Sequence, residues 1–357
     1  MTQGGTEQGT EQVLVLGTGP VAQSTATAFV DLGFDAWVGT LTNQLPDDLR
    51  PVLTVVCENS DFDLDELAEL QEATGTQLVP SLDACRITRD REGVRRTAAE
   101  ELGLPTMAYE FARTPDELAR CAEAVGFPCV VKPPVSSGGK GQTVVHAPAD
   151  LAQAWRSARE VNPEGAVAVE RYVDFDYEVT IITARSIDPA TGQLATWFCE
   201  PIGTRHEAGR LVEAWQPAPL SEAAMDNARS IAARITGKIG AQGVYSVELF
   251  VAGDDVYFSD VNPRPSLDGM ITRATQRVDQ FDLHARAVAG LPIDVTLVTP
   301  GATRFVPAAA IDRESMARVL AVEETGVQVL PDMALVRSTG DTVDEARERA
   351  GRAVAEL

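Results

Sequence analysis

The N-terminal part of the chain alternates short apolar runs with segments of helical periodicity. Residues 13–16 form an apolar run that ends in a Gly-Thr-Gly turn, and an apolar-periodic segment follows from Val21 to Leu32 and stops at a glycine. A strand, a glycine turn and a helix open a βαβ unit, and glycine commonly follows the last residue of a helix. The pattern predicts a small α/β domain over residues 13–87, preceded by a polar tail, residues 1–12, that we expect to be disordered.

The glycine turn, Gly17 to Ala22, is close to a dinucleotide-binding fingerprint but has alanine in place of the third glycine. No acidic residue ends the second predicted strand at the distance where it would bind a ribose. The turn is therefore only a weak indication of NAD binding. A plain βαβ turn and a contact to a small ligand, through Gly19 and Pro20, are the alternatives.

Two alternating stretches further along the chain predict a β-hairpin that carries acidic residues. Tyr245–Val251 and Val256–Val261 alternate apolar and polar positions on either side of a Gly-Asp-Asp turn. Because side chains alternate across a strand, a three-residue turn at Gly253–Asp255 places Glu248 opposite Asp260. The opposite face of the hairpin is then expected to hold Val247, Leu249, Val251, Tyr257, Ser259 and Val261.

A loop rich in serine and glycine follows a short apolar strand near the middle of the chain. Residues 131–142 read VKPPVSSGGKGQ, with Lys132 at the end of the strand and Lys140 inside the loop. Glycines allow backbone N–H groups to approach phosphate oxygens, and lysine adds a point charge. The loop is not a Walker A sequence, because Gly141 and Gln142 follow Lys140. Taken alone, the loop fits a phosphate cradle and an ordinary hairpin connection equally well.

The acidic hairpin favours the phosphate cradle. Two carboxylates directly opposite each other repel unless a cation lies between them, and Mg²⁺ binds through one or two carboxylates while it shares substrate phosphates. Asn262 adds a third oxygen, and Arg264 adds a guanidinium suited to phosphate or carboxylate. A hairpin with a solvated acidic face is the alternative.

Composition limits the classes of ligand. The 357 residues suit two or three domains, and the 53 acidic and 30 basic residues give a net charge of −23, which argues against nucleic-acid binding. No stretch approaches the ~18 consecutive apolar residues of a membrane span, and the five cysteines lack metal-ligand spacing. We therefore expect a soluble, cytoplasmic protein that binds small molecules, neither nucleic acid nor membrane.

The strand lysine, the glycine-rich loop and the Glu…Asp-x-Asn-Pro-Arg hairpin together resemble the ATP-grasp superfamily. Within it, the chain resembles the formate-dependent phosphoribosylglycinamide formyltransferases of purine synthesis. The matching stretches are DREGVRRTAAEELGLPT (90–106), GFPCVVKPPVSSGGKGQT (126–143), DFDYEVTIIT (174–183), EAWQP (213–217) and VYSVELFVAGDDVYFSDVNPRP (244–265).

The resemblance implies an α/β ATP-grasp fold with ATP and Mg²⁺ as cofactors, and a homodimer. Such enzymes phosphorylate a carboxylate with ATP, and an amine then attacks the acyl phosphate. The implied domains are the tail (1–12), a Rossmann-like pre-grasp domain (13–87), an ATP-grasp domain of two lobes (88–170 and 171–295) and a small C-terminal cap (296–357).

The resemblance also assigns roles to individual residues. ATP contacts are implied for Arg91, Lys132, Ser137, Gly138, Gly139, Lys140, Gly141 and Gln142, for an adenine hinge at Glu170, Arg171, Tyr172 and Val173, and for Glu178 at the ribose. Magnesium ligands are implied at Glu248, Asp260 and Asn262, and catalytic charges at Arg264, Lys140 and Lys132. Substrate contacts are implied at Gly19, Pro20, Glu58, Arg205, Trp215 and Asp268. Because no protein nucleophile is needed, we expect structural roles for His146, His206 and His284, with His206 a partial exception beside Arg205.

The sequence departs from the family where glycinamide ribotide would bind. The family has Pro-Glu-x-Glu where residues 56–63 read VCENSDFD, and His-Asp-Thr-Gly where residues 266–269 read SLDG. Its C-terminal cap has a lysine and a paired arginine that hold the ribotide phosphate, whereas residues 329–339 read VLPDMALVRST, with Arg337 the only cation. A dianionic phosphate in so acidic a protein needs local cations.

We therefore expect formate, or another small carboxylate, to be transferred to a smaller, unphosphorylated amine. The alternatives are an amide ligase that uses no formate, and formylation of glycinamide ribotide itself. A nucleotide-binding protein without turnover is a further hypothesis, and the intact lysines and hairpin residues argue against it.

Overall fold

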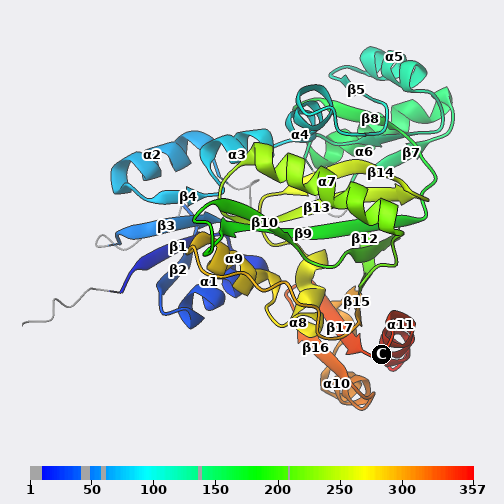
Figure 1. Cartoon of the computed structure of the whole chain (residues 1–357). Coiled ribbons are helices and arrows are strands. Elements are labelled where there is room, and N and C mark those ends of the chain that lie inside the picture. Colours follow the sequence, from blue (N-terminus) through cyan, green and yellow to red (C-terminus); the bar gives the residue numbers. More distant parts are fainter. Residues whose placement is uncertain (1–9, 42–48, 58–61, 136–138, 208–209) are drawn as a thin grey trace, which may run out of the picture.

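The computed structural model describes residues 10–41, 49–57, 62–135, 139–207 and 210–357. Three sheets organise these residues (Figure 1). The N-terminal sheet lies to one side of a large central sheet, and the small lobe lies above the opposite end of it. No helix in the described ranges is long and apolar enough to span a membrane.

The N-terminal sheet is parallel, with the strand order β2-β1-β3-β4. Strand β1 begins at Gln12, one residue inside the predicted tail, and helix α1 begins at Pro20 directly after the glycine turn. The elements of this region are β1 (Gln12–Leu16), α1 (Pro20–Asp31), β2 (Asp35–Gly39), β3 (Pro51–Val56), α2 (Leu64–Thr74), β4 (Gln77–Val79) and α3 (Leu82–Ile87).

The small lobe is a four-stranded antiparallel sheet in the order β5-β8-β6-β7, covered by α5 and α6. Helix α4 and a π-helical turn at Thr97–Glu101 lead into it. The elements are α4 (Arg91–Arg96), β5 (Tyr109–Ala112), α5 (Pro115–Val125), β6 (Cys129–Lys132), β7 (Thr143–Val145), α6 (Leu151–Val161) and β8 (Val167–Arg171).

The large sheet runs β14-β13-β9-β11-β12-β15-β17-β16, with β10 paired to β9. The C-terminal strands therefore extend the central sheet across the β12–β15 pairing. Its strands are β9 (Tyr177–Ile187), β10 (Leu194–Phe198), β11 (Ile202–Glu207), β12 (Arg210–Gln216), β13 (Gly243–Ala252), β14 (Asp255–Asn262), β15 (Gly301–Pro307), β16 (Thr325–Val329) and β17 (Met333–Thr339). Its helices are α7 (Glu222–Ile239), the 3₁₀ turn η3 (Asp268–Ile271), α8 (Thr272–Thr275), α9 (Gln280–Val288), α10 (Arg313–Leu320) and α11 (Val343–Val354).

Two buried apolar clusters cover the two faces of the large sheet. One contains Val15 and Phe29 of the N-terminal domain together with Ile182 and Phe281. The other lies beneath α7 and includes Ile181, the neighbour of Ile182 on the same strand. Because neighbouring strand residues face opposite sides, the N-terminal domain packs on one face of the sheet and α7 on the other.

A buried carboxylate attaches the C-terminal helix to the large sheet. Glu213 is 1 % exposed and accepts hydrogen bonds from Arg205 at 3.1 Å and from Arg347 of α11 at 2.9 Å. Arg304 of β15 lies 3.2 Å from the same carboxylate. Burial alone would raise the pKa of Glu213, but these arginines hold it below its usual value. Arg347 also lies 4.1 Å above the ring of Trp215, so α11 is fixed to the sheet by charge and by stacking.

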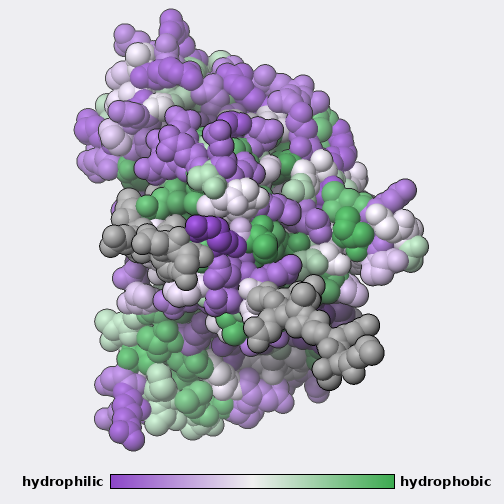
Figure 2. Space-filling view, turned by 90° about the vertical axis from the view of Figure 1, so that its left-hand side faces the viewer, coloured by the Kyte–Doolittle hydropathy of each residue, from purple (hydrophilic) through white to green (hydrophobic). Residues whose placement is uncertain are grey.

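The outer surface is strongly hydrophilic over the small lobe, while apolar residues gather lower on the side shown in Figure 2. Exposed apolar side chains on α1 and the N-terminal sheet include Val30, Trp37, Val38 and Val52. Strand β2 is an edge of that sheet. The homodimer implied by the resemblance remains a prediction.

The acidic hairpin has the predicted pairing for a different reason. Glu248 is the partner of Asp260, as expected, but Ala252 pairs with Asp255, so the turn has two residues and not three. A bulge between Glu248 and Leu249 restores the register. The expected face partners were therefore wrong in part, because the bulge turns Phe258 toward the core in place of Tyr257 and Ser259, and Phe258 is fully buried.

Candidate active site

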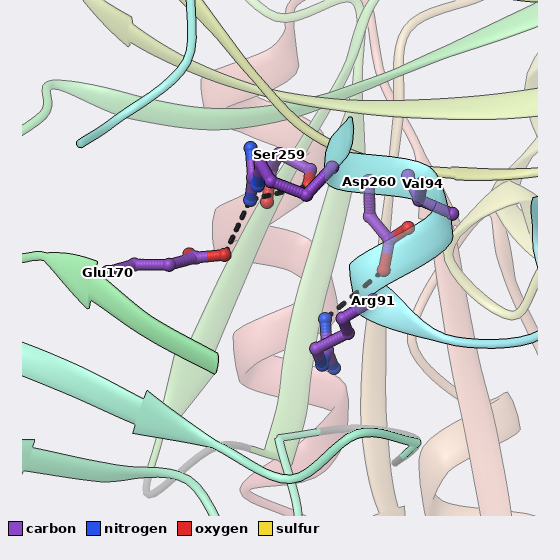
Figure 3. A pocket seen from close by; sticks show the side chains of 6 residues that line it. Arg91, Val94, Glu170, Ser259 and Asp260 are labelled. Carbon is purple, nitrogen blue, oxygen red and sulfur yellow. Dashed lines mark hydrogen bonds and ion pairs between the residues drawn. The ribbon is translucent and has the colours of Figure 1, made fainter. Parts of the chain in front are cut away.

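The predicted phosphate and metal residues meet where α4, the small lobe and the acidic hairpin come together. Figure 3 shows the small pocket at this junction, with Arg91 extended toward Asp260 and Glu170 approaching from the opposite side. Arg91 belongs to α4, Glu170 to β8 and Asp260 to β14. Residues from three separate parts of the chain thus contribute charge to one place.

A buried three-residue ion cluster lies beside this pocket. Glu170 is 2 % exposed, and its carboxylate accepts from Lys132 Nζ at 2.5 Å and from Arg95 Nη2 at 2.6 Å. Arg95 also donates to the backbone carbonyls of Phe258 and Ser259. Burial would raise the pKa of Glu170, but the charges of Arg95 and Lys132 outweigh it, and the pKa lies well below its ordinary value.

Arg95 was missed by the sequence analysis. It lies in the same DREGVRR stretch as Arg91, and nothing in that stretch indicates a partner 75 residues away. Its guanidinium ties α4 to both the small lobe and the hairpin. The side chain of Glu170 holds Lys132, and the expected position of Glu170 at the adenine hinge remains a prediction.

Glu248 lies within a group of carboxylates. Desolvation and the negative charges of Asp260, Asp268 and Glu178 raise the pKa of Glu248 well above its ordinary value. Asp268, at the start of η3, is therefore close enough to the acidic hairpin for its charge to act on Glu248, and its implied contact with the substrate remains a prediction. A bound cation would reverse this effect, because a nearby positive charge favours the ionised carboxylate.

Neighbouring side chains constrain both carboxylates. Arg91 Nη1 donates to Asp260 Oδ2 at 3.2 Å. The amide of Asn262 donates to Glu248 Oε1 over a long 3.4 Å, and Arg264 Nη2 lies 3.5 Å from Asn262 Oδ1. The three expected metal ligands and Arg264 are thus adjacent, and the long contacts leave their oxygens available for shorter ones.

The donor set fits Mg²⁺ only with help from a ligand. In the described parts of the chain, no group of three or more His, Cys, Asp or Glu side chains could hold a metal ion. Glu248, Asp260 and the amide oxygen of Asn262 supply hard oxygen donors, as Mg²⁺ requires. The remaining positions would be taken by water and phosphate oxygens, which is the usual arrangement for Mg²⁺ at a nucleotide.

The glycine-rich loop connects β6 and β7. Gly139 and Gly141 have positive φ angles of 72° and 78°. A Cβ at Gly141 would lie 2.6 Å from a methyl group of Val161, so only glycine fits there. Lys140 is exposed, and Gln142 N donates to the carbonyl of Gly139. Ser137 and Gly138 lie outside the described residues.

A second hollow of about 300 Å³ lies beside the candidate ribose ligand, Glu178. Its lining includes Arg205, His206 and Trp215. His206 Nδ1 lies 2.8 Å from Glu178 Oε2. Burial lowers the pKa of His206, but the hydrogen bond and the charge of Glu178 raise it by more. His284, for which a structural role was expected, is fully buried; its Nδ1 accepts from Val244 N, and burial lowers its pKa to about 4.

The remaining predicted residues lie in several places. In the expected hinge, Arg171 and Tyr172 donate backbone hydrogen bonds to Ala108 and Pro128, and Val173 follows them. Gly19 is the N-cap of α1 and Pro20 is its first residue. Trp215 packs over Gly203, where a Cβ would lie 2.2 Å from the ring. Glu58 lies outside the described residues. The roles of all these residues remain predictions.

Comparisons with known proteins place this arrangement in a class. The family model described as the ATP-grasp domain matches residues 97–281. A carboxyaminoimidazole ribonucleotide synthase from Aspergillus clavatus, solved with ATP, has the same fold, with a TM-score of 0.82 and 18 % identity over 97 % of this chain and 98 % of that chain. The protein is an ATP-grasp enzyme, as the sequence predicted.

Closer relatives define the family within this class. Formate-dependent phosphoribosylglycinamide formyltransferases are 43 % identical in Corynebacterium glutamicum strain R (97 % of this chain, 94 % of the relative) and 48 % identical in Corynebacterium jeikeium (84 % and 76 %). The structure of glycinamide-RNase-transformylase T from Mycobacterium tuberculosis is 34 % identical, with a TM-score of 0.80 over 97 % of this chain and 100 % of that chain. The chain belongs to the family of the formate-dependent phosphoribosylglycinamide formyltransferases.

The relatives bear on the expected acceptor. Their names favour glycinamide ribotide, the alternative in the sequence analysis, over the smaller unphosphorylated amine that we expected. The alignment with the C. glutamicum relative spans 385 positions, more than the 357 residues of this chain, so the relative has segments that this chain lacks.

Proposed function

We propose that the enzyme uses ATP to activate formate and transfers the formyl group to an amine, with glycinamide ribotide as the first candidate acceptor. A formate oxygen attacks the γ-phosphorus of ATP, and ADP leaves. The amine nitrogen then attacks the carbonyl carbon of formyl phosphate, inorganic phosphate leaves, and the nitrogen loses a proton. The family identity supports this reaction, and the relatives' names support the acceptor.

The observation that carries the proposal is the opposition of Glu248 and Asp260 beside the cations of α4 and the small lobe. Phosphoryl transfer depends mainly on positioning and on neutralising charge. Lys132, fixed by Glu170, and Arg91 would bind phosphate oxygens, and Lys140 would approach from the glycine-rich loop. Mg²⁺, held by Glu248, Asp260 and Asn262, would neutralise charge on the transferred phosphoryl group when bound.

The Arg91–Asp260 ion pair is compatible with a site in which a bound phosphate would replace Asp260 as the partner of Arg91. Both side chains are only partly exposed, at 17 % and 26 %. A triphosphate would give Arg91 a more highly charged partner and would leave Asp260 to a cation. Arg264, adjacent to Asn262, would then face the carboxylate or the transferred phosphoryl group.

A second candidate acceptor is an amine without a phosphate. It is favoured by the short connection between β16 and β17, Leu330–Asp332, which contains no lysine or arginine. The family holds the ribotide phosphate with cations in this part of the cap. An amide ligase that uses another carboxylate is the remaining alternative.

The test is ADP release by the purified enzyme with ATP and Mg²⁺, with and without formate, and with either glycinamide ribotide or a panel of unphosphorylated amines. Formate-dependent release with the ribotide would support the first candidate. Release that needs formate but only an unphosphorylated amine would support the second. Release that does not depend on formate would refute formyl transfer and favour the ligase.

A further inference from the structure

Arg337 of β17 lies on the same face of the large sheet as the candidate active site. Cross-strand partners form an unbroken row from Glu178 through Thr204, Ala214 and Thr303 to Arg337. Directly paired residues share a face, so Arg337 projects to the side of Glu178. Four strand spacings of about 4.8 Å put the two backbones about 19 Å apart.

The segment that follows Arg264 runs along this row. The 3₁₀ turn η3, which begins at Asp268, packs on β11, β12 and β15, and α8 packs on β17. Arg273 of α8 is close enough to Arg337 for the charge of Arg273 to lower the pKa of Arg337. The chain therefore leads from the acidic centre to a second arginine beside Arg337.

Among the residues that the structure describes, Arg337 has no partner for its charge. It is partly buried, yet within the described residues it makes no hydrogen bond or ion pair through its side chain. Burial lowers the pKa of its guanidinium, and the charge of Arg273 lowers it further, against a smaller opposite effect of Asp279. Arg273 itself donates to Asp279 at 3.1 Å and stacks over Phe281 at 4.7 Å, so it is held in place.

Two other buried arginines of this chain, in contrast, have acidic partners. Arg349 in α11 is 7 % exposed and has three glutamates as partners. Arg95 pairs with Glu170 and with two carbonyls. In a chain with 53 acidic residues, a partly buried arginine next to another arginine is costly unless a ligand supplies the negative charge.

The surroundings of Arg337 have room and a spare polar group. A Cβ built at Gly326, the β16 partner of Arg337, would meet no atom within 4 Å. On the other side, Thr303 is fully buried and its hydroxyl has no hydrogen-bond partner among the described residues. Gly326, Arg337 and Thr303 are thus neighbours on one face of the sheet, and the charge of Arg273 acts on Arg337.

We propose that Arg337 and Arg273 form a binding site for an anionic group, a phosphate or a carboxylate, at the end of the acceptor remote from its amine. The inference rests on the proposed function in so far as the ligand is the acceptor. The cations of this anion site come from β17 and α8. The relatives' cap cations, in contrast, were expected in the β16–β17 connection. An anionic acceptor would then be bound without those family cations.

The test measures binding without turnover. The full-length chain is saturated with a non-hydrolysable ATP analogue and Mg²⁺ to fill the nucleotide site, and its melting temperature is followed during titration with ribose 5-phosphate or with glutarate. At least one probe should stabilise the wild type. Arg337→Gln should weaken that apparent affinity by about 10- to 100-fold, since a hydrogen bond to a charged group contributes ~1.5–3 kcal/mol. Arg337→Lys should retain part of it.

Arg277→Gln is the matched control, because Arg277 is 65 % exposed and has one long ion pair of 3.7 Å with Asp294. It should respond to the probes as the wild type does. Without probe, Arg337→Gln should melt at the same temperature as the wild type or higher, because it removes an unpaired charge. A response to ribose 5-phosphate but not to glutarate identifies a phosphate monoester. A response to glutarate but not to ribose 5-phosphate identifies a carboxylate.

The proposal is overturned if neither probe stabilises the wild type, if Arg337→Gln responds normally, or if this variant melts lower in the absence of probe. The last result would give Arg337 a structural role. Formate-dependent ADP release is measured separately. If that activity is absent while binding through Arg337 is present, the proposed function fails and the anion site stands.

Discussion

Replacing Glu170 by glutamine removes the only carboxylate of a buried ion cluster. Glu170, Arg95 and Lys132 have side chains that are 3 %, 4 % and 10 % exposed. The variant leaves two cations without their counter-charge in a poorly solvated place. Removing one partner of a buried ion pair costs about 3–5 kcal/mol, and we expect the free energy of unfolding to fall by that amount.

The chain offers a control with the same number of ion pairs. Glu92 pairs with Arg96 and Arg113, whose side chains are 48 % and 61 % exposed. Exposed pairs contribute up to ~1 kcal/mol, so Glu92→Gln should change stability little. Both variants are compared with the wild type by urea unfolding followed by circular dichroism. A cost for Glu170→Gln no larger than that of Glu92→Gln would refute the argument that burial decides the energy.

The same carboxylate predicts a dependence on pH. Because the pKa of Glu170 is lower in the folded chain than its ordinary value of 4.5, its stabilising effect is fully present above pH 4.5. The effect is lost as the pH falls from there through the folded pKa. The difference in stability between wild type and Glu170→Gln should therefore be constant near neutral pH and shrink in acid.

Three further changes follow from the site. Glu248→Ala should lower formate-dependent ADP release about 100-fold or more, equivalent to ~2.7 kcal/mol of transition-state stabilisation. Circular dichroism should show that the variant is still folded. Near-normal turnover would contradict the assignment of Glu248 to the metal site. Gly141→Ala should raise the KM for ATP and lower the melting temperature, because φ is 78° and Val161 blocks a Cβ; unchanged values would show that the loop can move. His206→Gln should destabilise the chain most below pH 6.5, because Glu178 raises the pKa of His206, and this difference should vanish as the pH rises through that raised pKa; a difference independent of pH in melting curves would contradict the ion pair.

Local sequence patterns were sufficient for most secondary-structure elements near the site. The strand β6 ends at Lys132 as predicted, and α1 follows the glycine turn as expected. These elements depend on periodicity, caps and turn residues that act within a few positions. The ATP-grasp class was also predictable, because its motifs place lysine, glycine and carboxylate at characteristic positions along the chain.

The hairpin shows the limit of such patterns. The sequence determined that Glu248 and Asp260 would face each other, but alternation alone gave the wrong turn and the wrong partners for Tyr257 and Ser259. The bulge is decided by packing, since it buries Phe258 against the core. A one-residue change in register has no local signal that is strong enough to predict it.

By itself, the sequence determined the fold class, the nucleotide-binding motifs and the acidic hairpin, because these depend on neighbouring residues. Tertiary structure decided which charges meet. It brought Arg95 to Glu170, His206 to Glu178 and Arg273 to Arg337 across long separations in the chain. Electrostatic energy depends on distance in space and on burial. Neither quantity can be read from the spacing of residues along a sequence.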